Sequence, residues 1–430
     1  MSGLRLNLVE LGHSGHHAGY LRHLVRAWPE FSGAQSMLRI TATPGLASAH
    51  PDLVRALDEQ RVEGVELQVL DPRIADDLEA AARPDRIPLS WLIGSGPPGE
   101  IFSRKAWDVA QRSAREFGAD QLVFMEVDPV LPAVAAHLPA ACRFSGIWFG
   151  PARGSASPSE RRWALDQGLL VRRALGHPDL LQLFCLDPAA TDQLTQRLGA
   201  TPLSYLPDPV TIPVPVSRSA RMAIRARLGI PGRNQALLFF GQLATRKGLR
   251  EILAAVEALS RERLARLSLL VAGPTLDIDL AELREKAERL RRLGTHVVVL
   301  PEFTTDEVAE DLFRACDAVL AIYRNHVGMS GVMLRAAAHG RPVLSQSYGL
   351  MGELCRRHRL GLTVDVDDPA SLGSVLAAAS DGEFGSGFDP TAAALFAQSH
   401  DVRDFCRSFY MALGLSSRSR AATAGQSMQA

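Results

Sequence analysis

Short apolar runs alternate with helix-period segments along most of this chain. This alternation is typical of strand–helix–strand units that build a mostly parallel sheet. In the first half it predicts strands at Leu4–Glu10, Ser36–Thr43, Val65–Leu70, Gln121–Val127, Phe144–Phe149 and Leu181–Leu186. In the second half it predicts strands at Ala236–Phe240, Ser268–Ala272, His296–Leu300, Ala318–Ile322, Pro342–Ser345 and Leu362–Val364.

The alternation breaks at the segment LPDPVTIPVPVSRS, which begins at Leu206. Its four prolines can neither continue a helix nor donate to a central sheet ladder. Because 430 residues also exceed one ordinary core, we expect two Rossmann-like, doubly wound α/β domains at 1–207 and 221–413. A linker at 208–220 joins them, a disordered tail follows at 414–430, and the amphipathic segment at 391–413 fits against either half. Open sheets bind ligands at the carboxyl ends of their strands, so we expect a site in a cleft between the halves.

Composition narrows the range of functions. The chain has 47 basic and 47 acidic residues, so no net positive field favours a nucleic-acid partner. Its five cysteines are far apart, without a C-x-x-C pair or zinc-type spacing, and read as reduced thiols. No apolar run reaches the length of a membrane span, and no leader pattern precedes the first predicted strand. We expect a cytoplasmic protein whose membrane contacts, if any, are peripheral.

A basic pair stands at the turn between a predicted strand and the next helix. The strand ends at Gly241, Arg246 and Lys247 follow, and Gly248 opens a helix with an apolar stripe. A cation at a helix N-terminus opposes the macrodipole unless an anion binds there too. The chain contains only three lysines, which makes Lys247 unusual. The turn therefore predicts a phosphate site, with a solvated surface pair as the alternative.

A second helix N-terminus follows the predicted strand Ala318–Ile322. Ser330 has the character of an N-cap, and the next two residues, Gly331 and Val332, would offer N–H groups that the helix itself leaves unpaired. Small residues allow a phosphate to approach this backbone closely. An ordinary capped helix explains the same pattern, so the segment supports a phosphate site only together with the basic turn.

These segments resemble the signatures of GT-B glycosyltransferases of the family 4 type. The segment from Gly241 to Gly248 is similar to their G-R-L-x-x-x-K-G turn, and that from Gly328 to Val343 is similar to E-G-F-G-L-P-x-x-E-A-x-A-x-G-x-P-V. The order, the spacing and the PDP at Pro207–Pro209 also fit. The resemblance covers most of the second half, and the first half mainly by topology. It implies a GT-B fold, in which two Rossmann-like domains face a cleft, the second binding a nucleotide sugar and the first an acceptor.

The resemblance also implies roles for individual residues. Lys247 and Gly248 match the first motif, whereas Gln242 stands where the family has an arginine, for which Arg246 is the nearby substitute. Val327 and Arg335 stand where the family has two glutamates, one beside the sugar and one at the ribose. The residues expected to contact the sugar donor are Gly241, Gln242, Gly248, Gly273, Phe303, Ser330, Gly331, Val332, Met333 and Arg335, with Gly12 and Gly15 from the first half.

The first half offers candidate acceptor contacts after two of its strands. The glycine-rich turn after Glu10 carries three histidines: His13 and His17 are expected on the acceptor side, and His16 joins Lys247 and Arg246 as a catalytic candidate because histidine titrates near neutral pH. Solvated loop histidines are the alternative. Without a second ligand cluster we expect no metal. Glu126 and Asp128 end another strand and are expected to bind acceptor hydroxyls, unless they only cap the following helix.

The function implied is transfer of a sugar from a nucleotide diphosphate donor to a sugar, glycan or lipid-linked acceptor, with retention of configuration. No cofactor or metal is expected, because fixed cations and helix N-termini would stabilise the departing diphosphate. Two alternatives stay open: a nucleotide-sugar epimerase or hydrolase of the same fold, and a catalytically silent GT-B module. The silent module stays an alternative because both glutamates of the family motif are absent.

Overall fold

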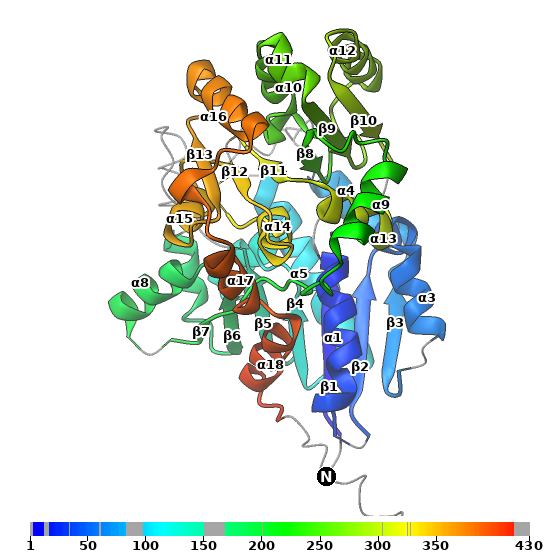
Figure 1. Ribbon diagram of the computed structural model, residues 1–430. Helices are drawn as coiled ribbons and strands as arrows, with labels where there is room; N and C mark the ends of the chain where they lie inside the picture. Colours follow the sequence, from blue (N-terminus) through cyan, green and yellow to red (C-terminus); the bar gives the residue numbers. More distant parts are fainter. Residues whose placement is uncertain are drawn as a thin grey trace, which may run out of the picture. The chain divides into compact units, whose positions relative to one another are not determined.

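The computed structural model forms two compact units, which are described separately (Figure 1). It describes residues 3–12, 17–33, 35–59, 62–82, 98–149, 168–199, 201–302, 304–324, 326 and 328–416. The first unit comprises the described residues up to Pro207 together with those from Val402 onward. The second unit comprises Asp208–Asp401. Each unit is built on a parallel sheet of its own, as the alternation of apolar runs and amphipathic segments predicts.

The first unit contains a seven-stranded parallel sheet in the order β3-β2-β1-β4-β5-β6-β7. The strands are β1 (Arg5–Glu10), β2 (Met37–Ala42), β3 (Val65–Val69), β4 (Gln121–Phe124), β5 (Arg143–Trp148), β6 (Leu180–Cys185) and β7 (Leu203–Tyr205). The strand order reverses between β1 and β4, which pair in parallel. This switch point is where an open α/β sheet leaves a crevice at the carboxyl ends of its strands.

Helices cover both faces of this sheet. They are α1 (His17–Phe31), α2 (Pro44–Ala49), α3 (Pro51–Glu59), α4 (Pro72–Ala82), α5 (Pro98–Phe117), η2 (Asp128–Val130), α6 (Leu131–Ala135), α8 (Pro188–Leu198) and α18 (Val402–Ala412). Successive residues of β1 pack into the hydrophobic cores on opposite faces of the sheet. Leu8 packs with α1, α2 and α18, while Val9 packs with α5 and α6. Burial on both faces is the reason that β1 carries apolar residues on both of its faces.

The second unit contains a six-stranded parallel sheet in the order β10-β9-β8-β11-β12-β13. The strands are β8 (Gln235–Phe240), β9 (Leu267–Ala272), β10 (His296–Leu300), β11 (Ala318–Ala321), β12 (Val343–Gln346) and β13 (Gly361–Val364). The helical segments are α9 (Arg218–Arg227), η3 (Thr245–Lys247), α10 (Leu249–Glu257), α11 (Arg261–Ala265), α12 (Leu280–Arg292), α13 (Asp306–Ala315), α14 (Gly331–Ala338), α15 (Gly349–Arg357), α16 (Pro369–Asp381), η4 (Gly385–Gly387) and α17 (Pro390–Gln398). Here too the order reverses at the centre, between β8 and β11.

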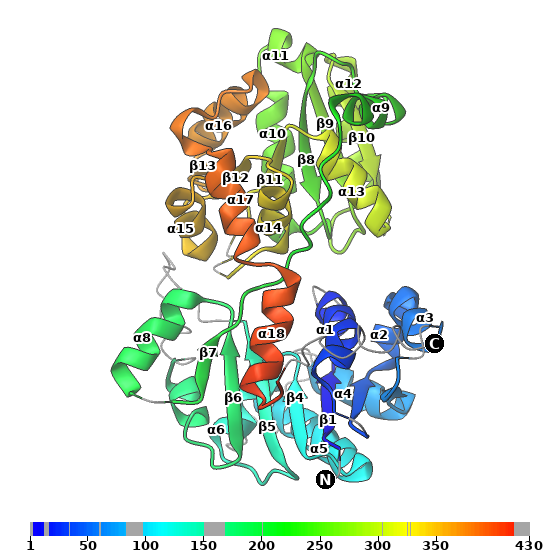
Figure 2. The ribbon, with the colours of Figure 1, turned by 60° about the horizontal axis from the view of Figure 1, so that its bottom comes forward.

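Two helical layers sandwich the second sheet (Figure 2). Leu237 and Phe239 of β8 pack with α10, α11, α12 and α16, whereas Ala236 and Leu238 face α9, α13, α14, α15 and α17. All twelve predicted strands correspond to observed strands, with ends that differ by a few residues at most. The predicted α/β class, with two doubly wound domains, is confirmed. The expected cleft between the domains stays a prediction.

The last helix corrects the predicted domain boundary. The prediction assigned 221–413 to the second domain, but α18 belongs to the first unit. Its Tyr410 hydroxyl donates to the Leu24 carbonyl at 2.7 Å, and its ring stacks on Phe31. Phe405 and Phe409 are fully buried on the same face. Helix α17 packs instead on α14 of the second unit, so the amphipathic segment 391–413 is shared between the units. Most of the predicted tail, from residue 417 on, lies outside the described residues.

Candidate functional site

At two positions of the turn after β8, the backbone adopts a conformation that favours glycine. Gly241 has φ +93° and Gly248 has φ +71°, both in the left-handed region. A Cβ on Gly248 would lie 2.5 Å from the Ile322 carbonyl oxygen, so the start of α10 approaches the end of β11 without room for a side chain. The Thr245 N–H donates to Asp277 at 2.7 Å, which fixes the middle of the turn. The sequence thus positions the basic pair through glycine geometry and one backbone anchor.

Lys247 is a buried cation. Only 7% of the residue is exposed, and no carboxylate among the described residues lies within ion-pair distance of its ammonium group. The Nζ atom is 5.3 Å from the centroid of the Tyr323 ring and lies 2.8 Å from the place a Cβ on Gly241 would take. Burial, with a smaller contribution from the charge of Arg246, lowers the pKa of Lys247 to about 8. A desolvated ammonium without a counter-charge is poised to receive an anion.

Arg246 lies differently from its neighbour. Its side chain is exposed, and its carbonyl oxygen accepts a 2.6 Å hydrogen bond from the Arg324 N–H. Arg246 therefore contributes positive charge from the surface, while Lys247 contributes it from inside the turn. Gln242, half-buried after Gly241, occupies the position that the resemblance gives to arginine.

The first turn of α14 lies beside this ammonium. The Cγ2 atom of Val332 is 4.0 Å from the place a Cβ on Gly241 would take. Ser330 holds the N-cap position, but its side chain makes no capping hydrogen bond; its hydroxyl pairs with the Tyr323 hydroxyl at 3.2 Å. In an α-helix the N–H groups of Gly331 and Val332 have no intrahelical acceptor. The structure thus brings the two predicted motifs together, while their role in binding stays a prediction.

Tyr323 joins the two motifs and was missed by the sequence reasoning. Its ring lies next to the Lys247 ammonium and its hydroxyl bonds Ser330. Its backbone is held on both sides, since its N–H donates to Gln346 at 3.2 Å and its carbonyl accepts from Tyr348 at 3.0 Å. Gln346 is fully buried at the end of β12. A polar residue that ends a short buried strand is the signal that could have pointed to this support.

Arg335 belongs to a separate polar cluster on α13 and α14. Its guanidinium lies over the rings of Phe240 and Phe313 and donates to Glu310 at 3.1 Å. The other carboxylate oxygen of Glu310 is 3.1 Å from Nε2 of His339. These partners, His339 first, lower the pKa of Glu310 to about 2. Arg335 is therefore a cation held in place beside the last residue of β8.

Three other predicted positions have different outcomes. Gly273 is required structurally, since a Cβ there would lie 2.2 Å from the Gly241 carbonyl oxygen. Met333 was expected to contact the sugar donor, but its side chain lies in the hydrophobic core and its N–H donates to the Ser330 carbonyl. Phe303 lies outside the described residues, as does Val327.

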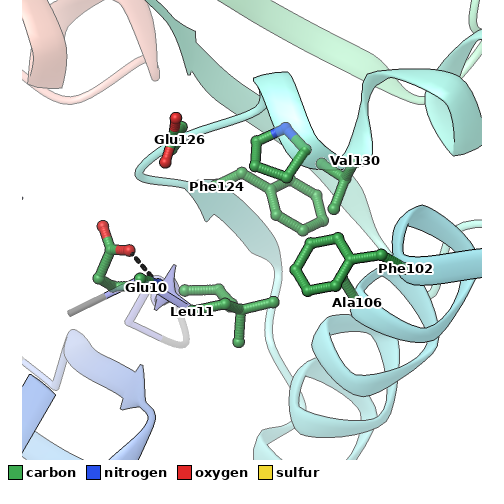
Figure 3. Close-up of a pocket in the computed structure, with 10 residues that line it drawn as sticks. Glu10, Leu11, Phe102, Ala106, Phe124, Glu126 and Val130 are labelled. Carbon is green, nitrogen blue, oxygen red and sulfur yellow. Dashed lines mark hydrogen bonds between the residues drawn. The ribbon is translucent and has the colours of Figure 1, made fainter. Parts of the chain in front are cut away.

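A pocket of about 100 Å³ lies at the carboxyl edge of the first unit's sheet, at the switch point between β1 and β4 (Figure 3). Glu10 and Glu126 stand at one side of it, and Phe102, Phe124 and Val130 at the other. Only 1% of Glu10 is exposed, and its Oε1 accepts a 2.7 Å hydrogen bond from the Gly12 N–H. The prediction named Gly12 and Glu126 but missed Glu10, although a carboxylate ending a buried strand just before a glycine turn is a readable signal.

The other first-unit candidates lie apart from this pocket or are not described. Asp128 accepts a hydrogen bond from the Phe149 N–H at 3.0 Å and is not among the residues that line the pocket. That bond ties β5 to η2, so Asp128 has a structural role; the helix cap expected as the alternative is not observed. His13, Gly15 and His16 lie outside the described residues, and of His17 only its backbone position at the start of α1 is described. Among the described residues no three His, Cys, Asp or Glu side chains gather in an arrangement for a metal ion.

None of the helices in the described part of the chain has the length and apolar character to cross a membrane.

Comparison with known proteins agrees with this geometry. Residues 234–380, which carry both motifs, match the family model of glycosyl transferases group 1. A D-inositol 3-phosphate glycosyltransferase of Xylanimonas cellulosilytica is 31% identical over 53% of this chain and 51% of its own length. One of Streptomyces scabiei is 34% identical over 36% of each chain. The chain thus spans about half the length, or less, of the curated relatives it matches.

Solved structures resemble the whole chain in fold. HepE of Anabaena in complex with UDP-glucose aligns with a TM-score of 0.63 at 16% identity, covering 96% of this chain and 99% of that one. WaaG, a glycosyltransferase involved in lipopolysaccharide biosynthesis, aligns with a TM-score of 0.60 at 14% identity, covering 94% and 98%. Residues 234–380 thus match the family model of glycosyl transferases group 1, and the chain that carries them has the GT-B fold.

Proposed function

We propose that this chain is a glycosyltransferase that moves a sugar from a nucleotide diphosphate donor to a hydroxyl-bearing acceptor, with retention of configuration. The observation that supports it most is the ammonium of Lys247, which has no carboxylate partner among the described residues and is buried beside the first turn of α14. A diphosphate there would meet the ammonium, the N–H groups of Gly331 and Val332, and the helix dipole. The family match of the segment that carries these residues supports the same assignment.

In this proposal the protein stabilises the leaving diphosphate by fixed charges. As the bond between the sugar and the diphosphate breaks, negative charge grows on the diphosphate, and groups already oriented toward it lower the barrier without reorganising. Lys247 supplies the buried charge, Arg246 the exposed one, and the N-terminus of α14 the dipole. We propose no cofactor or metal for this step, since these groups supply the positive charge.

The sugar donor to test first is UDP-glucose, because HepE, which shares the fold, was solved with it. The curated relatives are named for D-inositol 3-phosphate, but the match covers about half of their length or less. The acceptor is therefore proposed only as a hydroxyl compound. Arg335, stacked at the end of β8, is proposed to contact the nucleoside part of the donor, where a planar cation can stack on a base.

The decisive experiment compares two lysine variants. Lys247→Met removes the buried charge, and Lys286→Met removes a half-buried lysine on α12 of the same unit, where it pairs with Glu282 at 3.5 Å. We expect Lys247→Met to lower UDP release from UDP-glucose by at least about tenfold, since loss of one transition-state charge partner typically costs about 100-fold or more. Lys286→Met should leave the rate unchanged. Equal rates for wild type and Lys247→Met would refute the proposal.

The same assay separates the alternatives. UDP release that depends on an added acceptor supports transfer, and release without acceptor indicates a hydrolase or epimerase. A silent module would bind no nucleotide sugar, and a thermal-shift panel detects binding directly, because a ligand that binds only the native state raises its stability.

A further inference from the structure

The three lysines of this chain have different surroundings. Lys105 lies in the middle of α5 and is 2.6 Å from Asp77. Lys286 lies in the middle of α12 and is 3.5 Å from Glu282. Both are half-buried. Lys247 is 7% exposed, and no carboxylate among the described residues lies within ion-pair distance of its side-chain nitrogen. This nitrogen is therefore not occupied by a described carboxylate, in contrast to the other two.

The side-chain nitrogen of Lys247 is a nucleophile at mildly alkaline pH. Burial, followed by the charge of Arg246, lowers the pKa of Lys247 to about 8, so about half of the molecules carry the neutral amine near pH 8. A lysine of ordinary pKa, about 10.4, is neutral in only roughly 0.4% of molecules at that pH. The neutral form has a free electron pair, so Lys247 can attack a carbonyl group under conditions in which an ordinary lysine is almost fully protonated.

A phosphate group can be held beside this nitrogen even when the lysine is neutral. The nitrogen lies 2.8 Å, and Cγ2 of Val332 lies 4.0 Å, from the place that a Cβ on Gly241 would take, so the amine and the first turn of α14 face the same point. The first N–H groups of a helix have no intrahelical acceptor, and Ser330 provides no side-chain cap. Arg246 adds an exposed positive charge. The helix N-terminus and this arginine together attract an anion.

We propose that Lys247 is a site of acylation by small acyl phosphates such as acetyl phosphate. This inference rests on the anion site of the proposed function, although not on the transfer reaction. The phosphate end of the reagent lies at the N-terminus of α14, and its carbonyl carbon meets the neutral amine. A bond forms between Nζ and the carbonyl carbon, while the bond from that carbon to the bridging oxygen breaks. The phosphate leaves with the electron pair of that bond and takes up the amine proton.

Acylation would also change what the site binds. The product is a neutral amide, so the modification removes the buried positive charge that a diphosphate would meet. The level of acyl phosphates would then control how much of the protein can bind its nucleotide donor.

The test compares the three lysines under one reagent. The full-length protein is incubated with acetyl phosphate near pH 8, and peptide mapping by mass spectrometry follows the acetylated fraction at each lysine over time. We expect Lys247 to react at least about tenfold faster than Lys105 and Lys286, since roughly 100-fold more of its amine is neutral than in a lysine of ordinary pKa. A rate at Lys247 that is no higher than at the other two would overturn the inference.

A second reagent tests whether the phosphate matters. The N-hydroxysuccinimide ester of acetic acid transfers the same acetyl group but has no phosphate to lie at the helix N-terminus. Its preference for Lys247 over Lys105 should be at least about tenfold smaller than that of acetyl phosphate, because only the phosphate positions the carbonyl beside the amine. An equal preference with both reagents would overturn the phosphate contact.

Charge variants test the contribution of the arginine. For each variant, the rate at Lys247 with acetyl phosphate is divided by the rate with the ester, which cancels changes in the reactivity of the amine itself. Arg246→Gln should lower this ratio by about twofold or more, as expected for one exposed charge. Arg250→Gln removes an exposed arginine of α10 that pairs with Glu282 at 2.9 Å, and it should leave the ratio unchanged. An unchanged ratio in Arg246→Gln would overturn the role given to that arginine.

UDP separates failure of this inference from failure of the proposed function. UDP should slow acetylation of Lys247 and not of Lys105, and protein acetylated at Lys247 should bind UDP more weakly in a thermal-shift assay. If UDP binds and Lys247 shows no preference, the acylation inference is wrong and the glycosyltransferase assignment stands. If Lys247 is acetylated selectively and UDP does not bind, the acylation stands and the proposed function is wrong. Undiminished UDP binding by the acetylated protein would overturn the effect on donor binding.

Discussion

Replacing Lys247 by methionine should stabilise the second unit while abolishing nucleotide binding. The pKa of this lysine falls from 10.5 to about 8, because burial disfavours the charged form and Arg246 adds repulsion. That difference corresponds to about 3 kcal/mol of unfolding free energy lost near pH 7. The cation–π contact between Lys247 and Tyr323 offsets about 1 kcal/mol of this loss. Methionine fills similar space without a charge, so the expected gain is about 2 kcal/mol.

The sign of the pH dependence follows from proton linkage. The folded pKa lies below the unfolded one, so the unfolded state holds more protons and the cost of Lys247 shrinks as pH rises. The cost is full below about pH 8, where both states are charged, and it fades between about 8 and 10.5. At pH 10 it is about 1 kcal/mol, so the advantage of Lys247→Met should nearly vanish there.

Calorimetry of the full chain measures this difference. A gain of about 2 kcal/mol in a unit of this size raises its melting temperature by roughly 4–8 °C. All five tryptophans precede residue 207, so their fluorescence identifies the transition of the first unit, which should not move. Lys286→Met should leave both transitions in place. A less stable second unit in Lys247→Met at pH 7, or an advantage that does not change with pH, would refute the account of the buried charge.

Three other results are expected. UDP affinity should fall as pH rises through about 8, because the free protein then loses the Lys247 proton that the diphosphate needs. Calorimetry in buffers of different ionisation enthalpy should detect proton uptake on UDP binding, and an affinity that stays constant from pH 7 to 10 would contradict this. Gly241→Ala and Gly340→Ala both place alanine at positive φ and should each cost about 1 kcal/mol or more of stability, but only Gly241→Ala, whose Cβ would press on the ammonium, should weaken UDP binding. Glu310→Gln should lower the stability of the folded protein above pH 4.5, and this loss should disappear toward pH 2. The reason is that His339 lowers the pKa of Glu310, so the carboxylate contributes its full stability only at a pH where it is charged in both the folded and the unfolded state. A loss of stability that persists at pH 2 would indicate lost packing instead.

The fold was largely readable from the chain. Apolar strands between amphipathic helices predicted two parallel sheets, and the prolines after Leu206 predicted where the chain leaves the first unit. The return of the chain to the first unit at Val402 could not be predicted. An apolar stripe on a helix indicates that one face must be buried, but it does not indicate which sheet that face packs against. Tyr410 and Phe405 bury theirs against the first unit.

The candidate site was readable in part. Lys247 and Ser330 could be named because glycine turns, a rare lysine and helix starts are local signals. Tyr323 and Glu10 were missed: each has a weak local signal, but their importance comes mainly from neighbours distant in sequence. The ring of Tyr323 lies beside Lys247, and Glu10 lies across a pocket from residues of α5.

The sequence by itself determined which residues must be glycine, which strands are buried, and where positive charge meets a helix start, because these depend on spacing within a few residues. Only the tertiary structure decided that Lys247 is buried without a carboxylate partner among the described residues. It alone decided that Ser330 bonds Tyr323 and leaves the helix uncapped, and that Glu10 and Glu126 share one pocket. Burial and charge neutralisation depend on everything packed around a group, and parallel strands bring that surrounding from parts of the chain far apart in sequence.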